Sequence, residues 1–401
     1  MKKATGEQAK SWGLMRPLAL AGGAAGLSAL AASAGWVGAG AYLARMLLTP
    51  VYDKPDNVRV CAIDRKNETV TLVASADTIV PGRYGVWLNR GGSHIRIGHI
   101  VDRDDKAGTI IRRLEGIDFG EPEPGGGRWD SYYWAVGPER AFGLPYEDVF
   151  IPSEVGPLPA WLVRAEEVGR SRRCAVLVHG RGATRHETLR SIPVLHRLGW
   201  DVLVPSYRNA PGAPSSADGL YNLGLSEWRD VEASVDFAGR GGASEVALFG
   251  WSMGGAVVLQ MLDLSPLSSL VTRVVLDSPV VDWVDVIAEQ GRRRHIPPQL
   301  GTLAQSMIGA RWSRRLVGVH EPLDVARTSW QHRSGELAHP MLLIHSVDDE
   351  VVPVGPSREL AQLRTDLVRY EEWEVARHVK EWNTDPQRWE AVVADYLENG
   401  V

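Results

Sequence analysis

The segment Glu-Val-Ala-Leu-Phe-Gly-Trp-Ser-Met-Gly, residues 245–254, decides how the rest of the chain is interpreted. Its first five residues are an apolar run typical of a buried strand, and residues 253–264 have the pattern of a helix. Between the two lies a G-x-S-x-G motif, whose mechanical meaning depends on that strand-to-helix context. Gly250 and Gly254 leave space that a Cβ atom would fill. We therefore predict that Ser252 projects as a nucleophile from a sharp turn at the carboxyl edge of a sheet.

Strands and helices alternate on both sides of this motif. Apolar runs of this kind suit parallel strands that helices cover on both faces, so the pattern predicts a doubly wound α/β sheet. A hairpin at residues 148–163 comes first. The further expected strands lie at residues 174–178, 202–204, 245–249, 273–276, 341–344 and 368–373, and the helices at 187–198, 228–238 and 253–264.

The alternation lapses between residues 282 and 339, where short helical patches and the pair Pro297-Pro298 occur. An insertion between two strands can form a cap over a pocket. Its basic cluster, Arg292 to Arg294, fits either an anionic substrate or lipid headgroup, or simply a solvated helix face, which we favour.

A serine hydroxyl needs a base to remove its proton, and the base needs an acid to orient it. In α/β folds with this motif the order along the chain is serine, acid, histidine. His378 directly follows the expected strand at 368–373, and Asp349 lies in the turn after the strand at 341–344. We predict that Ser252, Asp349 and His378 form the catalytic set.

Several other residues compete for these roles. Asp348 is expected to cap the turn or to be solvated, and Asp277 is the fallback acid because it follows the strand at 273–276. His339 and His345 flank the preceding strand, where histidines are more often structural.

A developing oxyanion needs preformed donors. One is expected to be the main-chain N–H of Met253, next to the nucleophile. The loop His-Gly-Arg-Gly at 179–182 should supply the second, from Arg181, with Gly182 as the alternative. His179 is expected to brace this loop.

These motifs, over about residues 146–400, resemble the α/β-hydrolase superfamily, and most closely its small-capped esterase and serine-aminopeptidase-like branch. The resemblance implies an eight-stranded, mostly parallel sheet, a Ser-Asp-His triad, no metal and no organic cofactor. Ser346 departs from the pattern, since relatives usually have glycine there. Residues 379–383 resemble an extension of bacterial members and suggest no mechanistic role.

The N-terminal region has a separate character. A basic tail at residues 1–16 precedes a segment at 17–48 that is uncharged as far as residue 44 and long enough to span a bilayer. We favour an uncleaved single-helix anchor with the catalytic domain outside the cytoplasm. The alternatives are a cleaved signal peptide, which would give a secreted protein, and an Ala-rich soluble helix.

Residues 50–140 predict a small β-rich domain before the catalytic domain at 144–400. Its expected strands are at 58–63, 69–73, 93–97 and 109–113, and it should end near the Gly-rich loop at 121–127. His94 and His99 suggest either a ligand or metal site or, as we favour, solvated strand faces.

Composition limits the remaining possibilities. The 401 residues carry a formal net charge of −5 without long single-sign runs, so no nucleic-acid partner is indicated. The two cysteines, Cys61 and Cys174, do not suggest a disulfide or a metal cluster.

The sequence therefore predicts a hydrolase that cleaves a carboxylic ester of a small-molecule or lipid-like acyl substrate through an acyl-enzyme. The same residues would serve thioester hydrolysis, acyl transfer or an aminopeptidase-like serine peptidase. An inactive, membrane-tethered scaffold on the same fold is the alternative of a different class.

Overall fold

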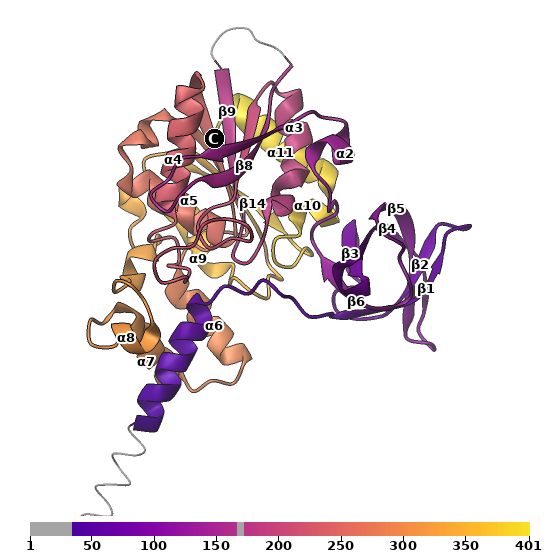
Figure 1. Ribbon diagram of the computed structural model, residues 1–401, viewed down its shortest axis with the longest axis horizontal. Coiled ribbons are helices and arrows are strands. Elements are labelled where there is room, and N and C mark those ends of the chain that lie inside the picture. Colours follow the sequence, from indigo (N-terminus) through magenta and orange to yellow (C-terminus); the bar gives the residue numbers. More distant parts are fainter. Residues whose placement is uncertain (1–33, 167–171) are drawn as a thin grey trace, which may run out of the picture.

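The computed structural model describes residues 34–166 and 172–401. In it the chain forms a small closed β barrel and a larger sheet covered by helices on both faces (Figure 1). The barrel lies to one side of the large sheet, and residues 49–57 run from a helix at residues 34–48 to its first strand (Figure 1). We call residues 34–48 the N-terminal helix.

Antiparallel strands form the barrel in the closed order β1-β2-β5-β4-β3-β6. Side chains alternate between its interior and its surface, so that Val70 and Leu72 are fully buried in β2. The expected β-rich domain is confirmed. Its strands are β1 (Val58–Asp64), β2 (Thr69–Val73), β3 (Tyr84–Leu88), β4 (Ser93–Asp104), β5 (Thr109–Phe119) and β6 (Gly125–Asp130).

The Gly-rich stretch corrects one prediction. Its second half is not a loop, because Gly125–Asp130 is strand β6, the last strand of the domain, which closes the barrel between β1 and β3. Glycine suits this strand, since a Cβ atom on Gly127 would lie 2.8 Å from Cδ2 of Leu88 and 3.0 Å from the main-chain oxygen of Trp87. Strand β3 is not among the strands expected from the sequence.

The solvated interpretation of His94 is also wrong. Its imidazole is fully buried, with Nδ1 3.0 Å from the Oδ2 atom of Asp118, whereas His99 is exposed. Within residues 34–166 and 172–401 no group of three or more His, Cys, Asp or Glu side chains is placed to hold a metal ion. His94 and Asp118 therefore form a buried structural pair.

The large sheet has eight strands in the order β14-β13-β12-β11-β9-β10-β8-β7. It is parallel from β14 to β10, and the hairpin of β7 and β8 continues it antiparallel, as predicted. The strands are β7 (Glu147–Ile151), β8 (Leu158–Val163), β9 (Arg172–Val178), β10 (Asp201–Pro205), β11 (Ala243–Trp251), β12 (Val271–Asp277), β13 (Met341–Ser346) and β14 (Val368–Trp373).

Helices cover both faces of this sheet and separate two apolar cores. One core contains α4 (Trp228–Arg240), α5 (Met253–Leu264) and α9 (Gly355–Leu363). The other contains α3 (Ile192–Arg197) and α11 (Pro386–Asn399).

The prediction of a helix at 187–198 is correct only for its second half. Residues Arg185–Ser191 form a 3-10 helix, and α3 begins at Ile192. Pro193 explains the boundary, because proline has no N–H to donate within a helix and is favoured in its first turn.

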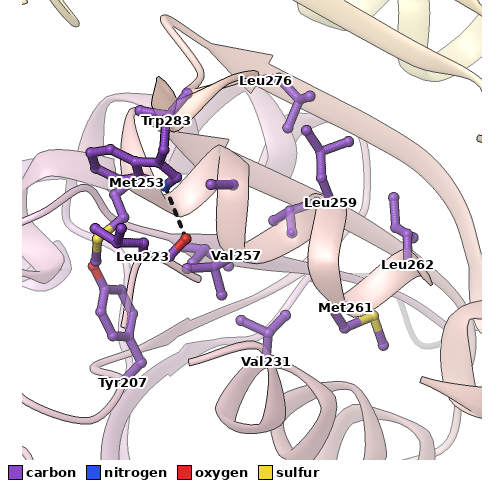
Figure 2. Close-up of a cluster of buried hydrophobic side chains, with 14 of the residues drawn as sticks. Tyr207, Leu223, Val231, Met253, Val257, Leu259, Met261, Leu262, Leu276 and Trp283 are labelled. Carbon is purple, nitrogen blue, oxygen red and sulfur yellow. Dashed lines mark hydrogen bonds between the residues drawn. The ribbon is translucent and has the colours of Figure 1, made fainter. Parts of the chain in front are cut away.

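Helix α5, which follows the G-x-S-x-G motif, lies in the middle of its core (Figure 2). Met253, Val257 and Met261 are fully buried on it, and Val231 of α4 packs in the same cluster. A helix that is apolar on all sides must be enclosed, and this enclosure fixes the position of the turn before it.

The predicted cap is present between β12 and β13. It includes α6 (Trp283–Arg293), α7 (Pro298–Gly309) and α8 (Arg314–Val317). The N-terminal helix packs against it, as Figure 1 shows, with Ala41, Ala44 and Leu48 buried in the same core as Met307 and Ile308 of α7.

The proposed membrane segment at 17–48 falls outside the described residues as far as residue 33. Among residues 34–166 and 172–401, no helix is long and apolar enough to cross a bilayer.

Candidate active site

Ser252 stands at the turn between β11 and α5 with φ 52° and ψ −118°, a conformation that costs a non-glycine residue energy. The neighbouring chain requires glycine at both flanking positions. A Cβ atom on Gly254 would lie 2.1 Å from the main-chain oxygen of Val178, and one on Gly250 would lie 2.7 Å from Cα of Gly255. The turn therefore holds the serine hydroxyl at the carboxyl edge of the sheet.

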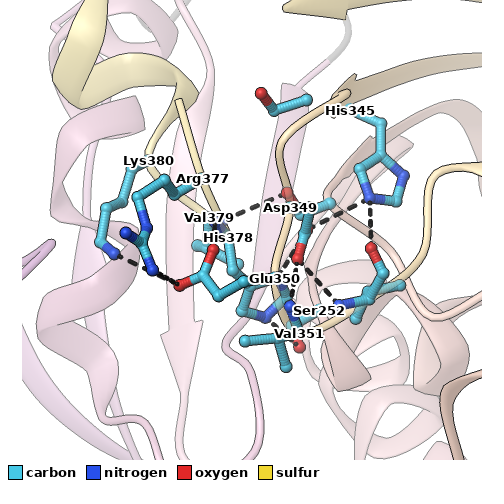
Figure 3. A network of polar contacts seen from close by, with 12 residues as sticks. Ser252, His345, Asp349, Glu350, Val351, Arg377, His378, Val379 and Lys380 are labelled. Atoms are coloured by element: carbon cyan, nitrogen blue, oxygen red, sulfur yellow. Dashed lines mark hydrogen bonds and ion pairs between the residues drawn. The ribbon is translucent and has the colours of Figure 1, made fainter. Parts of the chain in front are cut away.

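The serine hydroxyl contacts His378, and His378 in turn contacts Asp349 (Figure 3). The Nε2 atom of His378 lies 2.9 Å from Oγ of Ser252, and its Nδ1 atom lies 2.7 Å from Oδ2 of Asp349. An ionised carboxylate only accepts hydrogen bonds, so Nδ1 donates to Asp349 and Nε2 is left to accept from the serine hydroxyl. The structure thus brings together the three residues predicted from the sequence.

Asp349 is buried among donors. The main-chain N–H groups of Val351 and Val352 each donate to its Oδ1 atom at 2.8 Å, and Nε2 of His345 lies 3.2 Å from its Oδ2 atom. Burial alone would raise the pKa of Asp349, but the imidazoles of His378 and His345 outweigh it and hold that pKa far below its usual range. The carboxylate is therefore charged at neutral pH.

The interaction between Asp349 and His378 also changes the pKa of His378, in the opposite direction. Burial disfavours the imidazolium of His378, but the Asp349 carboxylate outweighs burial and raises the pKa of His378. The imidazole thus remains a competent proton acceptor with a stabilised charged form.

Asp348, the neighbour of the acid, has a structural position. It accepts hydrogen bonds from the main-chain N–H groups of Ala376 and Arg377, at 3.0 and 2.8 Å, and from the hydroxyl of Ser346, at 2.6 Å. Asp348 therefore stabilises the loop that carries His378. Ser346, which replaces the glycine usual in relatives, donates one of the hydrogen bonds that hold Asp348.

Asp277, His179 and His339 likewise make structural contacts. Asp277 accepts from the indole N–H groups of two tryptophans, at 3.2 and 2.9 Å. His179 stacks on Tyr207, and burial lowers the pKa of His179 to about 4. The Nε2 atom of His339 lies 3.0 Å from the main-chain oxygen of Ser268.

The loop at 179–182 approaches Ser252 closely. A Cβ atom on Gly180 would lie 3.2 Å from Cβ of Ser252. The N–H of Gly180 donates to the buried carboxylate of Glu187 at 2.6 Å, and that of Gly182 donates to the hydroxyl of Tyr221 at 3.3 Å. In the part of the chain that the structure describes, the main-chain N–H of Arg181 has no such partner. This leaves Arg181 as the free donor of the loop.

A cavity of about 300 Å³ opens beside Ser252 and His378. Most of its wall is apolar, contributed by the N-terminal helix, by the cap helices α6 and α7, and by Val351 and Val352. The charged and amide side chains that also line it are Arg181, Gln290, Arg294 and Gln305. Of the basic cluster Arg292 to Arg294, only Arg294 lines the cavity. Arg292 and Arg293 pair with Glu289.

Sequence reasoning missed two contributors to this site. The N-terminal helix has the composition of a membrane segment, and nothing in its periodicity marks it as a cavity wall. The segment after His378 has no predicted role, although Glu381 and Asn383 are fully buried in it. Two polar residues in a short segment directly after His378 are a pattern from which a structural role of this segment could have been predicted.

Comparison with known proteins agrees with this geometry. The family model described as the alpha/beta hydrolase family matches residues 175–398, and a domain of unknown function matches residues 59–130. No curated protein matches the chain. The chain therefore belongs to the alpha/beta hydrolase family and is a hydrolytic enzyme.

Solved structures share the fold at low identity. An esterase of Pyrococcus furiosus is 20% identical, with a TM-score of 0.50 over 66% of this chain and 94% of its own. An acylaminoacyl peptidase of Pyrococcus horikoshii is 16% identical, with a TM-score of 0.50 over 85% of this chain and 56% of its own. At these identities the likeness concerns the fold alone.

Proposed function

We propose that the protein is a serine hydrolase that cleaves carboxylic esters through an acyl-enzyme on Ser252. The observation that carries the proposal is the line from Ser252 through His378 to Asp349, with contacts of 2.9 and 2.7 Å, beside an apolar cavity. Such a line supplies what a weak hydroxyl nucleophile needs, which is a base and a fixed tautomer of that base.

The reaction follows from the direction of these hydrogen bonds. Oγ of Ser252 attacks the ester carbonyl while Nε2 of His378 takes its proton, and Asp349 stabilises the imidazolium. The N–H groups of Met253 and Arg181 donate to the oxyanion, where each donor contributes about a hundredfold or more to the rate. His378 then gives its proton to the leaving alcohol, and water repeats the sequence on the acyl-enzyme.

The lining of the cavity favours an ester over a peptide substrate. An aminopeptidase-like enzyme needs a carboxylate to bind the free amine of its substrate. Among the described residues that line the cavity there is no Asp or Glu, whereas two arginines, Arg181 and Arg294, are present. An uncharged acyl group suits this lining better than an ammonium group.

Steady-state kinetics on two matched substrates test the proposal. The protein should hydrolyse p-nitrophenyl butyrate, and Ser252→Ala and His378→Ala should each lower kcat by about a thousandfold or more. An aminoacyl p-nitroanilide should be a poor substrate. Efficient cleavage of the anilide with no cleavage of the ester would reject the ester assignment in favour of a peptidase.

We also propose that the part of the segment at 17–48 that precedes the N-terminal helix attaches the enzyme to a membrane, with the catalytic domain outside the cytoplasm and residues 34–48 packed on the cap. The support is the uncharged stretch from residue 17 to residue 44, preceded by Lys2, Lys3, Lys10 and Arg16. The full chain should need detergent for extraction from membranes. Release of the intact chain by high salt alone would contradict attachment by a spanning helix.

A further inference from the structure

The N-terminal helix forms one wall of the cavity beside Ser252. Leu43, Ala44, Met46 and Leu47 line the cavity from this helix. Cap helices α6 and α7 line it from the other elements, through residues that include Val286, Ile287, Ala304 and Ile308. The space next to the nucleophile is therefore bounded by a segment that lies more than a hundred residues before the catalytic domain's own cap.

Polar contacts fix the end of this helix to the loop at 179–182. The guanidinium of Arg181 donates through Nη2 to the main-chain oxygens of Leu47 and Thr49, both at 2.8 Å. The N–H of Tyr221 donates to the oxygen of Leu48, also at 2.8 Å. The last carbonyls of a helix have no partner within it, and a cation there also complements the helix dipole.

The same arginine belongs to the loop that faces Ser252. Its guanidinium lies 5.7 Å from the centre of the Tyr221 ring, and the Tyr221 hydroxyl accepts from the N–H of Gly182. The side chain of Arg181 thus connects the helix end to a stretch of backbone whose own N–H points to no acceptor among the described residues.

We propose that the N-terminal helix is part of the acyl-binding site, that Leu43 and Met46 determine which aliphatic acyl chains fit, and that Arg181 is a positioning residue through which the helix holds the oxyanion loop. This inference rests on the proposed ester hydrolysis. It names the substrate as an ester of an aliphatic acid whose chain lies between the N-terminal helix and α6 and α7.

The specificity part is tested by chain-length profiles. For wild type, kcat/KM on p-nitrophenyl esters should rise from acetate toward longer acids by about fourfold for each buried methylene, as apolar transfer predicts. Leu43→Trp fills the cavity and should lower the decanoate-to-acetate ratio of kcat/KM by about tenfold or more. Tyr42→Ala is the matched control, because Tyr42 lies on the same helix and is 69% exposed. An unchanged ratio in Leu43→Trp would overturn this part.

The positioning part is tested at Arg181. Arg181→Met keeps the main-chain N–H and removes the hydrogen bonds to the helix end. We expect kcat on p-nitrophenyl acetate to fall about tenfold or more with little change in KM, and Arg181→Lys to restore part of it. A folded Arg181→Met variant with wild-type kcat would overturn this part. If that variant does not fold, the Leu43→Trp profile still decides whether the helix is a wall of the site.

Failure of this inference is distinguishable from failure of the proposed function. If wild type hydrolyses no ester, the proposed function falls. If wild type hydrolyses esters while Leu43→Trp and Arg181→Met keep its profile and its kcat, only the role of the helix falls.

Discussion

The side-chain amide of Asn383 donates a hydrogen bond of 2.6 Å to the main-chain oxygen of Arg83, across the boundary between the hydrolase fold and the barrel. The main chain completes the contact, since the N–H of Arg83 donates to the oxygen of Asn383 at 2.8 Å. The fit is close, because a Cβ atom on Gly82 would lie 2.1 Å from that same oxygen. The barrel therefore packs directly on the segment that follows His378.

Ion pairs strengthen this contact beside the base. The carboxylate of Asp77, in the barrel, lies 3.5 Å from Nε of Arg377 and 3.6 Å from Nζ of Lys380, the residues on either side of His378 and Val379. The segment after His378 thus has a structural function that the sequence did not indicate, because the barrel contacts residues on both sides of His378.

Asn383→Ala should weaken both stability and catalysis. The change removes the amide that reaches Arg83 and Ser131 and the oxygen that accepts from Arg190, and it leaves buried polar groups without partners. We expect a loss of about 1–3 kcal/mol in the free energy of unfolding, with kcat reduced more than KM changes. Urea unfolding and ester kinetics measure both. Asp105→Asn, on an exposed ion pair of the barrel, is the control and should match wild type.

Glu381 should make stability fall as the pH rises above the ordinary glutamate range. Burial, reinforced by the negative charge of Asp277, raises the pKa of Glu381 well above its usual range. The hydroxyl of Ser278 donates to Oε1 of Glu381 at 2.7 Å.

The direction of that dependence follows from linkage. Because the folded-state pKa of Glu381 is raised, its contribution is complete below the unfolded-state pKa and is lost as pH rises through the folded-state pKa. Glu381→Gln cannot ionise and should flatten the decline in the urea midpoint as the pH rises above the ordinary glutamate pKa of about 4.3, relative to wild type. An equally steep decline in Glu381→Gln would show that another group is responsible.

Asp349→Asn should change both the rate and the pH profile. His378 must be neutral to accept the Ser252 proton, so kcat/KM should rise with pH through the pKa of His378. Asp349 raises that pKa against the effect of burial, so its removal should move the acid limb to lower pH. We also expect kcat to fall about ten-thousandfold, because the tautomer is no longer fixed. An acid limb that does not move would contradict the assignment of Asp349.

Alanine substitutions at two glycines should have opposite effects. In Gly254→Ala the new Cβ atom would lie 2.1 Å from the main-chain oxygen of Val178, and backbone cannot yield as a side chain does. We expect destabilisation by several kcal/mol, of the order seen for severe overpacking. Gly239→Ala is the control, because its Cβ would meet only Cδ1 of Leu270, at 3.5 Å, within helix α4. It should be neutral or stabilise by up to about 1 kcal/mol. Equal thermal midpoints for the two variants would contradict this account of the turn.

Local patterns explain what could be predicted from the sequence. The strand ending in Trp251, the turn at Ser252 and helix α5 follow from neighbouring residues, since apolar runs and glycines there have few other uses. The order of the serine, the acid and the histidine along the chain then indicates Asp349 and His378 among many candidates.

Long-range contacts explain which features could not be predicted from the sequence. The hydrogen bonds from Arg181 to Leu47 and from Asn383 to Arg83 join residues 134 and 300 positions apart, and no local pattern specifies either. The burial of His94 depends likewise on barrel closure, through a glycine strand whose composition indicates a loop.

The central claim is that Ser252 is an activated nucleophile, and labelling with a fluorophosphonate tests it most directly. The probe reacts with a serine only where a base removes the proton and donors stabilise the oxyanion. We predict that purified wild type is labelled and that Ser252→Ala is not, with mass spectrometry placing the adduct on residue 252. Equal labelling of folded Ser252→Ala, or no labelling of folded wild type, would contradict the claim.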